Sequence, residues 1–150
     1  MKNCKDHKKC KRKALELAKK LCDSNNLRLT EIRQTVLGLV WKSHKPIKAY
    51  DILKDIKGVG SEKPPTVYRA INFLLENGLI HKINSQQSYI GCEHPNLHKQ
   101  CYFLSCNKCG ETSECCSVEI DKMFKKTLKK EKFNQSNIVC EISGVCSSCS

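Results

Sequence analysis

Two pairs of cysteines have the spacing of zinc ligands. Cys106 and Cys109 form one Cys-x-x-Cys segment, and Cys146 and Cys149 form a second. A Cys-x-x-Cys turn directs two thiolates toward one point, so two such turns supply the four sulfur ligands of a tetrahedral zinc ion. The 36 residues between Cys109 and Cys146 exceed the length of a simple zinc-ribbon hairpin. We therefore expect a structural zinc site that fastens the C-terminal segment to a whole subdomain.

The N-terminal residues indicate a reducing compartment, which decides how the many cysteines are interpreted. Residues 1–13 contain no apolar stretch typical of a signal peptide, and no run in the sequence approaches the ~18 apolar residues of a membrane span. We therefore expect a cytoplasmic protein in which the clustered cysteines, among the 12 of the sequence, bind metal rather than form disulfides. Four further cysteines are left open as inert, as ligands of a third metal ion or as redox-sensitive thiols: Cys101, Cys115, Cys116 and Cys140.

Positive charge is concentrated in the first part of the sequence. Residues 1–91 contain 19 Lys and Arg against 8 Asp and Glu, whereas residues 92–150 contain 8 against 7. A basic region of this size favours a polyanionic partner, most often nucleic acid. Its first 13 residues look like a basic arm, in which Cys4, His7 and Cys10 are weak metal-ligand candidates. Nine of the 12 cysteines lie in residues 92–150, so we expect two domains with a boundary after residue 91.

The basic part has the pattern of several helices followed by a hairpin. Apolar residues at helical spacing predict helices over residues 11–22, 31–42 and 50–56, and Thr30 is a suitable N-cap for the second. Pro64 and Pro65 suit the first turn of a fourth helix, over residues 66–77. Two short strands follow, at residues 79–83 and 88–91. The order predicts a winged helix-turn-helix DNA-binding domain, whose last helix enters the major groove.

The outward face of helix 66–77 carries side chains suited to DNA. Thr66, Tyr68, Arg69 and Asn72 lie near its N-terminal end. Arginine forms bidentate contacts to guanine, and threonine or tyrosine contacts phosphate or a thymine methyl group. The alternative is that these are ordinary surface residues.

The cysteine-rich part predicts a smaller α/β domain. Strands are expected at residues 101–105 and 137–142, with an amphipathic helix over residues 117–130 between them. This β-α-β unit has too little apolar surface for a large core. We therefore expect it to gain stability from zinc and from pairing with a second copy. The fold class is α+β.

Taken together, these features resemble the ferric uptake regulator family, and most closely its zinc uptake regulator branch. The resemblance covers about residues 11–150, and Lys-Pro-Pro-Thr-Val-Tyr-Arg-Ala with His81 and Cys92 indicates the branch. The segments that carry it are Leu27-Arg28-Leu29-Thr30-x-x-Arg33, Ala49-Tyr50-Asp51-Ile52-Leu53, Lys63-Pro64-Pro65-Thr66-Val67-Tyr68-Arg69-Ala70-Ile71-Asn72-Phe73-Leu74, Ser105-Cys106-Asn107-Lys108-Cys109-Gly110 and Cys146-x-x-Cys149.

The resemblance implies a homodimeric repressor with zinc as corepressor. Metal-loaded dimers would bind double-stranded operator DNA and repress genes for metal uptake. It implies two zinc sites per subunit: the structural four-cysteine site and a regulatory site at His81, Cys92, His98 and Glu114. It also implies base contacts from Tyr50 and Arg69, with Thr66 and Tyr68 at the DNA backbone.

Several alternatives remain open. His94 competes with His98, and Cys115 competes with Glu114, as a regulatory ligand; His81 could contact phosphate instead. One sulfur, two nitrogen and one oxygen ligands suit zinc better than manganese. An iron- or peroxide-sensing member of the same family is a second interpretation, and a zinc-stapled nucleic-acid-binding protein without sensing is a third. No catalytic constellation or thioredoxin-like context is visible, so we expect neither an enzyme nor a small-molecule substrate.

Overall fold

The structure is a computed structural model that describes residues 6–57, 63–95, 101–136 and 138–150. The chain divides into two compact units, an N-terminal unit of residues 2–93 and a C-terminal unit of residues 94–150. Each has its own sheet, of order β1-β3-β2 in the first and β5-β4-β6 in the second. Among the described residues, no helix is long and apolar enough to cross a membrane.

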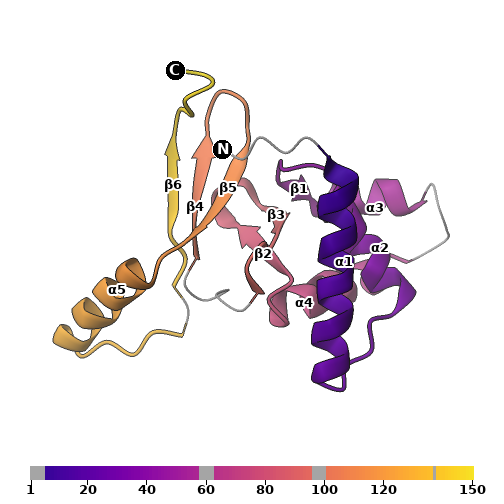
Figure 1. Cartoon of the computed structure of the whole chain (residues 1–150), viewed down its shortest axis with the longest axis horizontal. Coiled ribbons are helices and arrows are strands. Elements are labelled where there is room, and N and C mark those ends of the chain that lie inside the picture. Colours follow the sequence, from indigo (N-terminus) through magenta and orange to yellow (C-terminus); the bar gives the residue numbers. More distant parts are fainter. Residues whose placement is uncertain (1–5, 58–62, 96–100, 137) are drawn as a thin grey trace. The chain divides into compact units, whose positions relative to one another are not determined.

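The N-terminal unit is built from helices and a small sheet (Figure 1). The α-helices of this unit are between nine and eighteen residues long, and its strands are short. The elements are α1 (His7–Ser24), α2 (Glu31–Val40), β1 (Ile47–Lys48), α3 (Ala49–Lys57), α4 (Pro64–Glu76), β2 (Ile80–Ile83), the short 3-10 helix η1 (Asn84–Gln86) and β3 (Ser88–Gly91).

Helix α1 begins earlier than its apolar pattern predicts. The prediction of an arm over residues 1–13 is wrong from His7 onward, because the helix already includes the basic run. Asp6 is the N-cap, and its carboxylate accepts hydrogen bonds from the backbone N–H groups of Lys8 and Lys9, at 3.0 and 3.3 Å. A carboxylate at this position also interacts favourably with the helix dipole. Cys4 lies outside the described residues.

Helix α2 begins where it was predicted to begin, at Glu31, but ends earlier than predicted. Thr30 occupies the N-cap position, but its side chain makes no capping hydrogen bond. Its carbonyl instead accepts the first hydrogen bond of the helix, from the N–H of Gln34 at 3.0 Å. The helix ends at Val40, two residues before the predicted end, and Trp41 is the C-cap.

Helix α4 agrees closely with its sequence pattern. Lys63 is the N-cap and the two prolines fill the first turn, where a missing N–H costs no helical hydrogen bond. Its buried stripe consists of Val67, Ala70, Ile71 and Leu74. The helix ends at Glu76, and Gly78 then adopts a φ of +65°, a conformation that glycine tolerates best.

Strands β2 and β3 form the predicted antiparallel hairpin. His81 pairs with Ile90 and Ile83 with Ser88. Strand β1 was not predicted, because its two residues gain strand geometry only by pairing with β3, Ile47 opposite Tyr89. Strand β1 thus joins the hairpin to the segment just before α3.

The core of the N-terminal unit lies where α2, α3 and α4 meet the hairpin. Arg33 of α2 also places its guanidinium over the ring of Phe73 of α4, 3.5 Å from the centroid, a cation–π contact between the two helices. The core is a continuous set of buried apolar residues: Ala18, Val36, Leu37, Val40, Ile52, Ile56, Val67, Ala70, Ile71, Leu74, Leu79 and Ile80.

The C-terminal unit contains β4 (Cys101–Cys106), β5 (Thr112–Cys116), α5 (Val118–Lys130) and β6 (Glu141–Gly144). The predicted β-α-β order is therefore wrong, since β5 precedes the helix and pairs antiparallel with β4. Strand β6 begins at Glu141 rather than at residue 137, which lies outside the described residues. It pairs parallel with β4, from Phe103 opposite Glu141 to Cys106 opposite Gly144.

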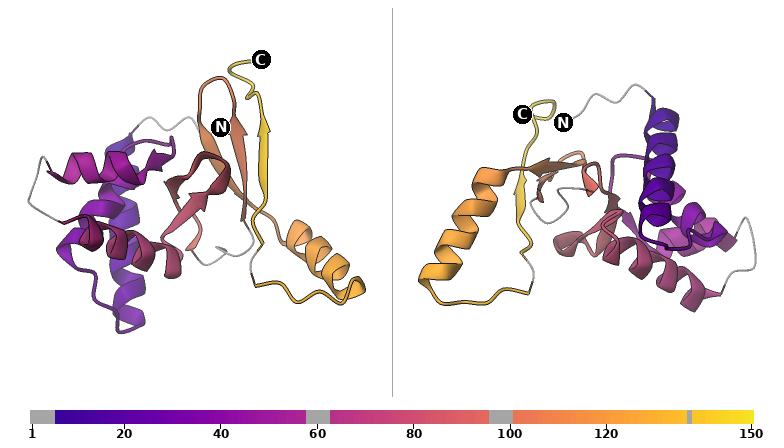
Figure 2. Two further views of the ribbon diagram at one scale, coloured as in Figure 1. Left: turned by 180° about the vertical axis from the view of Figure 1, so that it is seen from behind. Right: turned by 60° about the horizontal axis from the view of Figure 1, so that its bottom comes forward.

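Helix α5 extends from one end of this sheet in all the views of Figures 1 and 2. Ser117, predicted as the first residue of this helix, is its N-cap and accepts a 3.3 Å hydrogen bond from the N–H of Ile120. Asp121 is buried and its carboxylate accepts a 2.7 Å bond from Lys125. Met123 stays 57% exposed, so the helix covers little apolar surface within its own unit.

Candidate metal centre and nucleic-acid face

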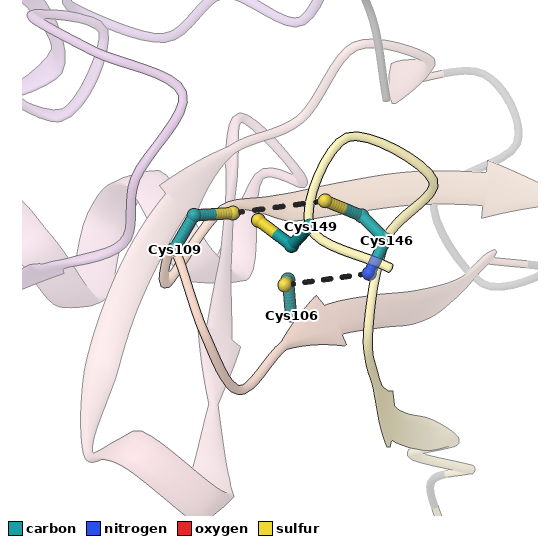
Figure 3. A group of neighbouring side chains, drawn as sticks. All are labelled: Cys106, Cys109, Cys146 and Cys149. Carbon is teal, nitrogen blue, oxygen red and sulfur yellow. Dashed lines mark hydrogen bonds between the residues drawn. The ribbon is translucent and has the colours of Figure 1, made fainter.

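Four cysteines converge at one end of the C-terminal sheet (Figure 3). The sulfur atoms of Cys106, Cys109, Cys146 and Cys149 all lie within 4.8 Å of one another. Cys106 ends β4 and Cys109 lies in the turn that follows, whereas the second pair lies in the turn after β6. The parallel pairing of Cys106 with Gly144 aligns the ends of β4 and β6. That alignment brings together cysteines far apart in sequence.

Hydrogen bonds hold the two turns in place. The backbone N–H of Cys146 donates to Cys106 Sγ at 3.4 Å, and the Sγ atoms of Cys109 and Cys146 are 3.9 Å apart. Lys108 Nζ donates to the carbonyl of Cys149 at 2.8 Å. Gly110, with a φ of +73°, closes the first turn. Tetrahedral Zn–S bonds place sulfurs ~3.8 Å apart, so these residues fit a zinc ion.

The protonation of the cluster also suits a metal. The N–H groups of Cys109 and Cys146 lower the pKa of the Cys106 thiol to about 6, so Cys106 is largely a thiolate at neutral pH. The hydrogen bond with the Cys146 side chain, together with burial, raises the pKa of Cys149 to about 12. Zinc must therefore displace protons from the cluster, and its affinity falls as the pH falls.

His81 and Cys92 lie on one face of the β2–β3 hairpin. His81 is opposite Ile90, and the N–H of Cys92 donates to the carbonyl of Leu79 at 3.0 Å. Residues two apart on a strand share a face, so His81 and Cys92 are diagonal neighbours. Both are buried, at 7% and 5% exposed. The N-terminal unit therefore offers one nitrogen and one sulfur ligand side by side.

Glu114 lies at the centre of a second cluster, in the C-terminal unit. It is opposite Phe103 and only 7% exposed. Ligand atoms of His94, Glu114 and Cys116 lie within 4.8 Å of one another. Of the two competing histidines, His94 is thus beside Glu114, whereas His98 lies outside the described residues. Cys115 faces away from Glu114, because adjacent residues of a strand point to opposite faces.

Cys101 and Cys116 are two of the four cysteines whose role the sequence left open, and their pairing was not predicted. They are paired as a disulfide across β4 and β5, so the expectation that cysteines serve as metal ligands rather than disulfides is wrong for this pair. Sequence reasoning missed the pair because β5 was not predicted. With β5 in place, the register puts Cys101 directly opposite Cys116.

The outward face of α4 presents the predicted DNA-contact residues. Tyr68 and Arg69 are exposed, Tyr68 at 45%, and Thr66 is half-buried in the first turn of the helix. Tyr50, near the start of α3, is the most exposed large apolar residue of the described chain, at 73%. Burial of Val67 and Ala70 on the opposite face explains why these side chains point outward.

The fold and the cluster define a protein of two units, with a four-cysteine, zinc-type centre in the smaller one. Comparison with known proteins agrees with this architecture. The chain is 37% identical over 139 residues to the zinc uptake regulation protein of Escherichia coli (strain K12), covering 90% of this chain and 80% of the relative. The model of the ferric uptake regulator family matches residues 24–143. The chain belongs to this family.

Solved structures give the same result. The holo form of XcZur superposes with a TM-score of 0.84 at 32% identity, covering 89% of this chain and 94% of that one. A zinc uptake regulator complexed with zinc and DNA superposes with a TM-score of 0.82 at 34% identity, covering 92% of this chain and 93% of that one.

Proposed function

We propose that this protein is a zinc-responsive transcriptional repressor, which binds operator DNA as a zinc-loaded homodimer and represses genes for zinc uptake. The observation that carries the proposal is its similarity, over nine-tenths of its length, to a zinc uptake regulator complexed with zinc and DNA. The proposed site of action is the cytoplasm, where the operator is. The chain is accordingly a regulator of transcription and not an enzyme.

The DNA-binding domain in this proposal is a winged helix-turn-helix formed by residues 1–91. Helix α4 is the recognition helix and the β2–β3 hairpin is the wing. Arg69 and Tyr50 read bases, while Thr66 and Tyr68 contact the backbone. Exposure of Arg69, Tyr68 and Tyr50 supports this assignment, and the basic charge of residues 1–91 supplies the affinity for phosphate.

The dimerisation domain in this proposal is formed by residues 92–150. Exposed apolar residues support it, because isolated domains rarely leave many such side chains in water. Leu104 of β4 and Ile142 of β6 lie opposite each other in the sheet and are 38% and 48% exposed. A second copy of the chain would cover such a surface.

Two zinc ions per subunit are proposed. The structural ion is held by Cys106, Cys109, Cys146 and Cys149. The regulatory ion is held by His81, Cys92, His98 and Glu114, and its binding shifts the population toward the form that binds DNA. His94 is the alternative to His98, favoured by its closeness to Glu114 and Cys116.

The test is operator binding across buffered free zinc, with iron(II) and manganese(II) in parallel. Tight binding only above a zinc threshold is the expected result. Binding that responds first to iron would support the iron-sensing interpretation, and binding that ignores every metal would leave a constitutive DNA-binding protein.

Three variants separate the zinc response from the DNA contact. His81→Ala should shift the zinc midpoint to higher concentration, whereas Lys82→Ala, its exposed neighbour on β2, should leave that midpoint unchanged. Arg69→Ala should lose about 1–3 kcal/mol of operator binding at saturating zinc without a change in zinc midpoint. An unchanged midpoint in His81→Ala would remove this residue from the regulatory site.

A further inference from the structure

Cys101 and Cys116 belong to neither set of proposed zinc ligands. They are directly opposite each other on β4 and β5, with Cα atoms 4.1 Å apart, and the structure pairs their sulfur atoms. Both side chains are only half-buried, so small oxidants and reductants reach them. The strand register brings the two thiols together, and no rearrangement of the chain is needed for them to react.

Both sulfur atoms face one buried carboxylate. Glu114 lies two residues before Cys116 and so shares its face of the sheet. Its Oε1 is 3.0 Å from Cys101 Sγ and 3.6 Å from Cys116 Sγ. A thiol at such a distance donates a hydrogen bond to the carboxylate, whereas a disulfide sulfur has no proton to donate. The surroundings of Glu114 therefore differ between the two oxidation states of the pair.

We propose that Cys101 and Cys116 form a reversible disulfide that weakens the regulatory zinc site when it closes. The link to zinc rests on the proposed function, in which Glu114 is a regulatory ligand, whereas the disulfide itself does not. Hydrogen bonds that orient a ligating carboxylate contribute about 10- to 100-fold to metal affinity. Loss of both thiol donors on oxidation therefore lowers zinc affinity, by about tenfold.

Hydrogen peroxide is a sufficient oxidant for this step. One thiolate attacks the peroxide, the O–O bond breaks, and a sulfenic acid and one water form. The second thiolate then attacks the sulfenic sulfur, the S–S bond forms, the S–O bond breaks, and a second water leaves. Two electrons pass from the sulfurs to the peroxide, and the two thiol protons end in water. A dithiol reverses the reaction through a mixed disulfide and is itself oxidised.

The chain contains a matched control on the same strand. Cys115 precedes Cys116 and is also half-buried, but it is opposite Tyr102 and points to the other face of the sheet. It resembles Cys116 in chemistry and exposure, but lacks both the opposing thiol and Glu114.

The test treats the reduced, zinc-loaded full chain with one equivalent of hydrogen peroxide, then blocks free thiols and maps peptides by mass spectrometry. We expect a crosslink between Cys101 and Cys116, with the four-cysteine zinc retained. Competition with a chromophoric chelator should show about tenfold weaker binding of the second zinc, restored by dithiothreitol. Cys116→Ser and, independently, Cys101→Ser should abolish both effects, and Cys115→Ser should keep both.

Different failures point to different conclusions. Crosslinks from Cys101 to another cysteine, or oxidation of the four-cysteine cluster before this pair, would overturn the disulfide. An unchanged affinity for the second zinc in crosslinked protein would overturn its effect on zinc. Operator binding by the reduced protein, measured in parallel, tests the proposed function alone: if it ignores zinc while the crosslink forms, only the proposed function fails.

Discussion

In the N-terminal unit, buried aliphatic side chains from all four helices form a continuous core. In the described part of the C-terminal unit, only Phe103 and Cys106 are buried apolar residues, and the four cysteines converge at one end of the sheet. Burial of apolar surface stabilises a unit of ordinary composition, whereas a small unit needs a metal or a partner. The comparison indicates that exclusion of water stabilises the first unit, whereas the second depends on a metal ion or a partner.

The substitution Cys106→Ser should give the largest effect, and it tests whether the C-terminal unit alone depends on zinc. Structural zinc sites contribute about 10–16 kcal/mol of apparent folding free energy at neutral pH, so loss of one ligand should release the ion and unfold the C-terminal unit. Hydrogen exchange of the full chain should show lost protection in β4, β5 and β6, with α2 and α4 unchanged. Cys115→Ser is the control and should retain zinc. Equal loss of protection in both units would refute the separation.

Leu74→Ala tests the other side of the comparison. Leu74 is fully buried in α4, and its truncation leaves a cavity that costs about 2–5 kcal/mol. The melting temperature of the N-terminal unit should fall, while zinc content stays the same. The control is Asn72→Ala on the exposed face of the same helix, which should change stability little. Loss of zinc from Leu74→Ala would show that the units are energetically coupled.

The substitution Gly91→Ala tests the packing of the β2–β3 hairpin against Trp41. A Cβ at Gly91 would overlap the indole ring of Trp41, so either the ring or β3 must move, at a cost of about 1–3 kcal/mol. Because Cys92 is the next residue, zinc binding at the regulatory site should weaken as well. Thermal unfolding and chelator competition measure the two effects. Wild-type stability would mean that Trp41 moves aside freely.

Ser117→Ala should give the smallest effect. It removes the N-cap of α5, which costs about 1 kcal/mol. The Ser117 hydroxyl also donates a 2.7 Å bond to Glu119 and lowers the pKa of that carboxyl below its ordinary 4.5. A lowered pKa means that this contribution is present above the unfolded value and is lost as pH falls through the folded one. In the variant, NMR titration should show the pKa of Glu119 returning toward 4.5.

Sequence patterns predicted the elements that carry their own local information. Helix α4 has prolines in its first turn, a buried stripe and a glycine after its end, and the hairpin of β2 and β3 has two strands around a short polar turn. Helix α5 was predicted to begin at residue 117, which is its N-cap in the structure. The two Cys-x-x-Cys pairs identified residues that the structure brings within 4.8 Å of one another.

The elements that were missed depend on distant parts of the chain. Strand β5 reads Thr-Ser-Glu-Cys-Cys, which has no apolar alternation, and it becomes a strand only by pairing with β4. Because β5 was not predicted, the closeness of Cys101, Glu114 and Cys116 could not be predicted either. The start of α1 was missed for a different reason: lysines are good helix formers, yet a basic run also suits an arm, and the cap at Asp6 decides between them.

The parallel pairing of β4 with β6 has a consequence for biosynthesis. Chains emerge from the ribosome from the N-terminus, and early domains generally fold first. The N-terminal unit can therefore complete its core while Cys146 and Cys149 are still untranslated. A product that stops before Cys146 would retain that folded unit but lack half of the cluster. Zinc capture would thus distinguish finished chains from truncated ones, before either competes for an operator.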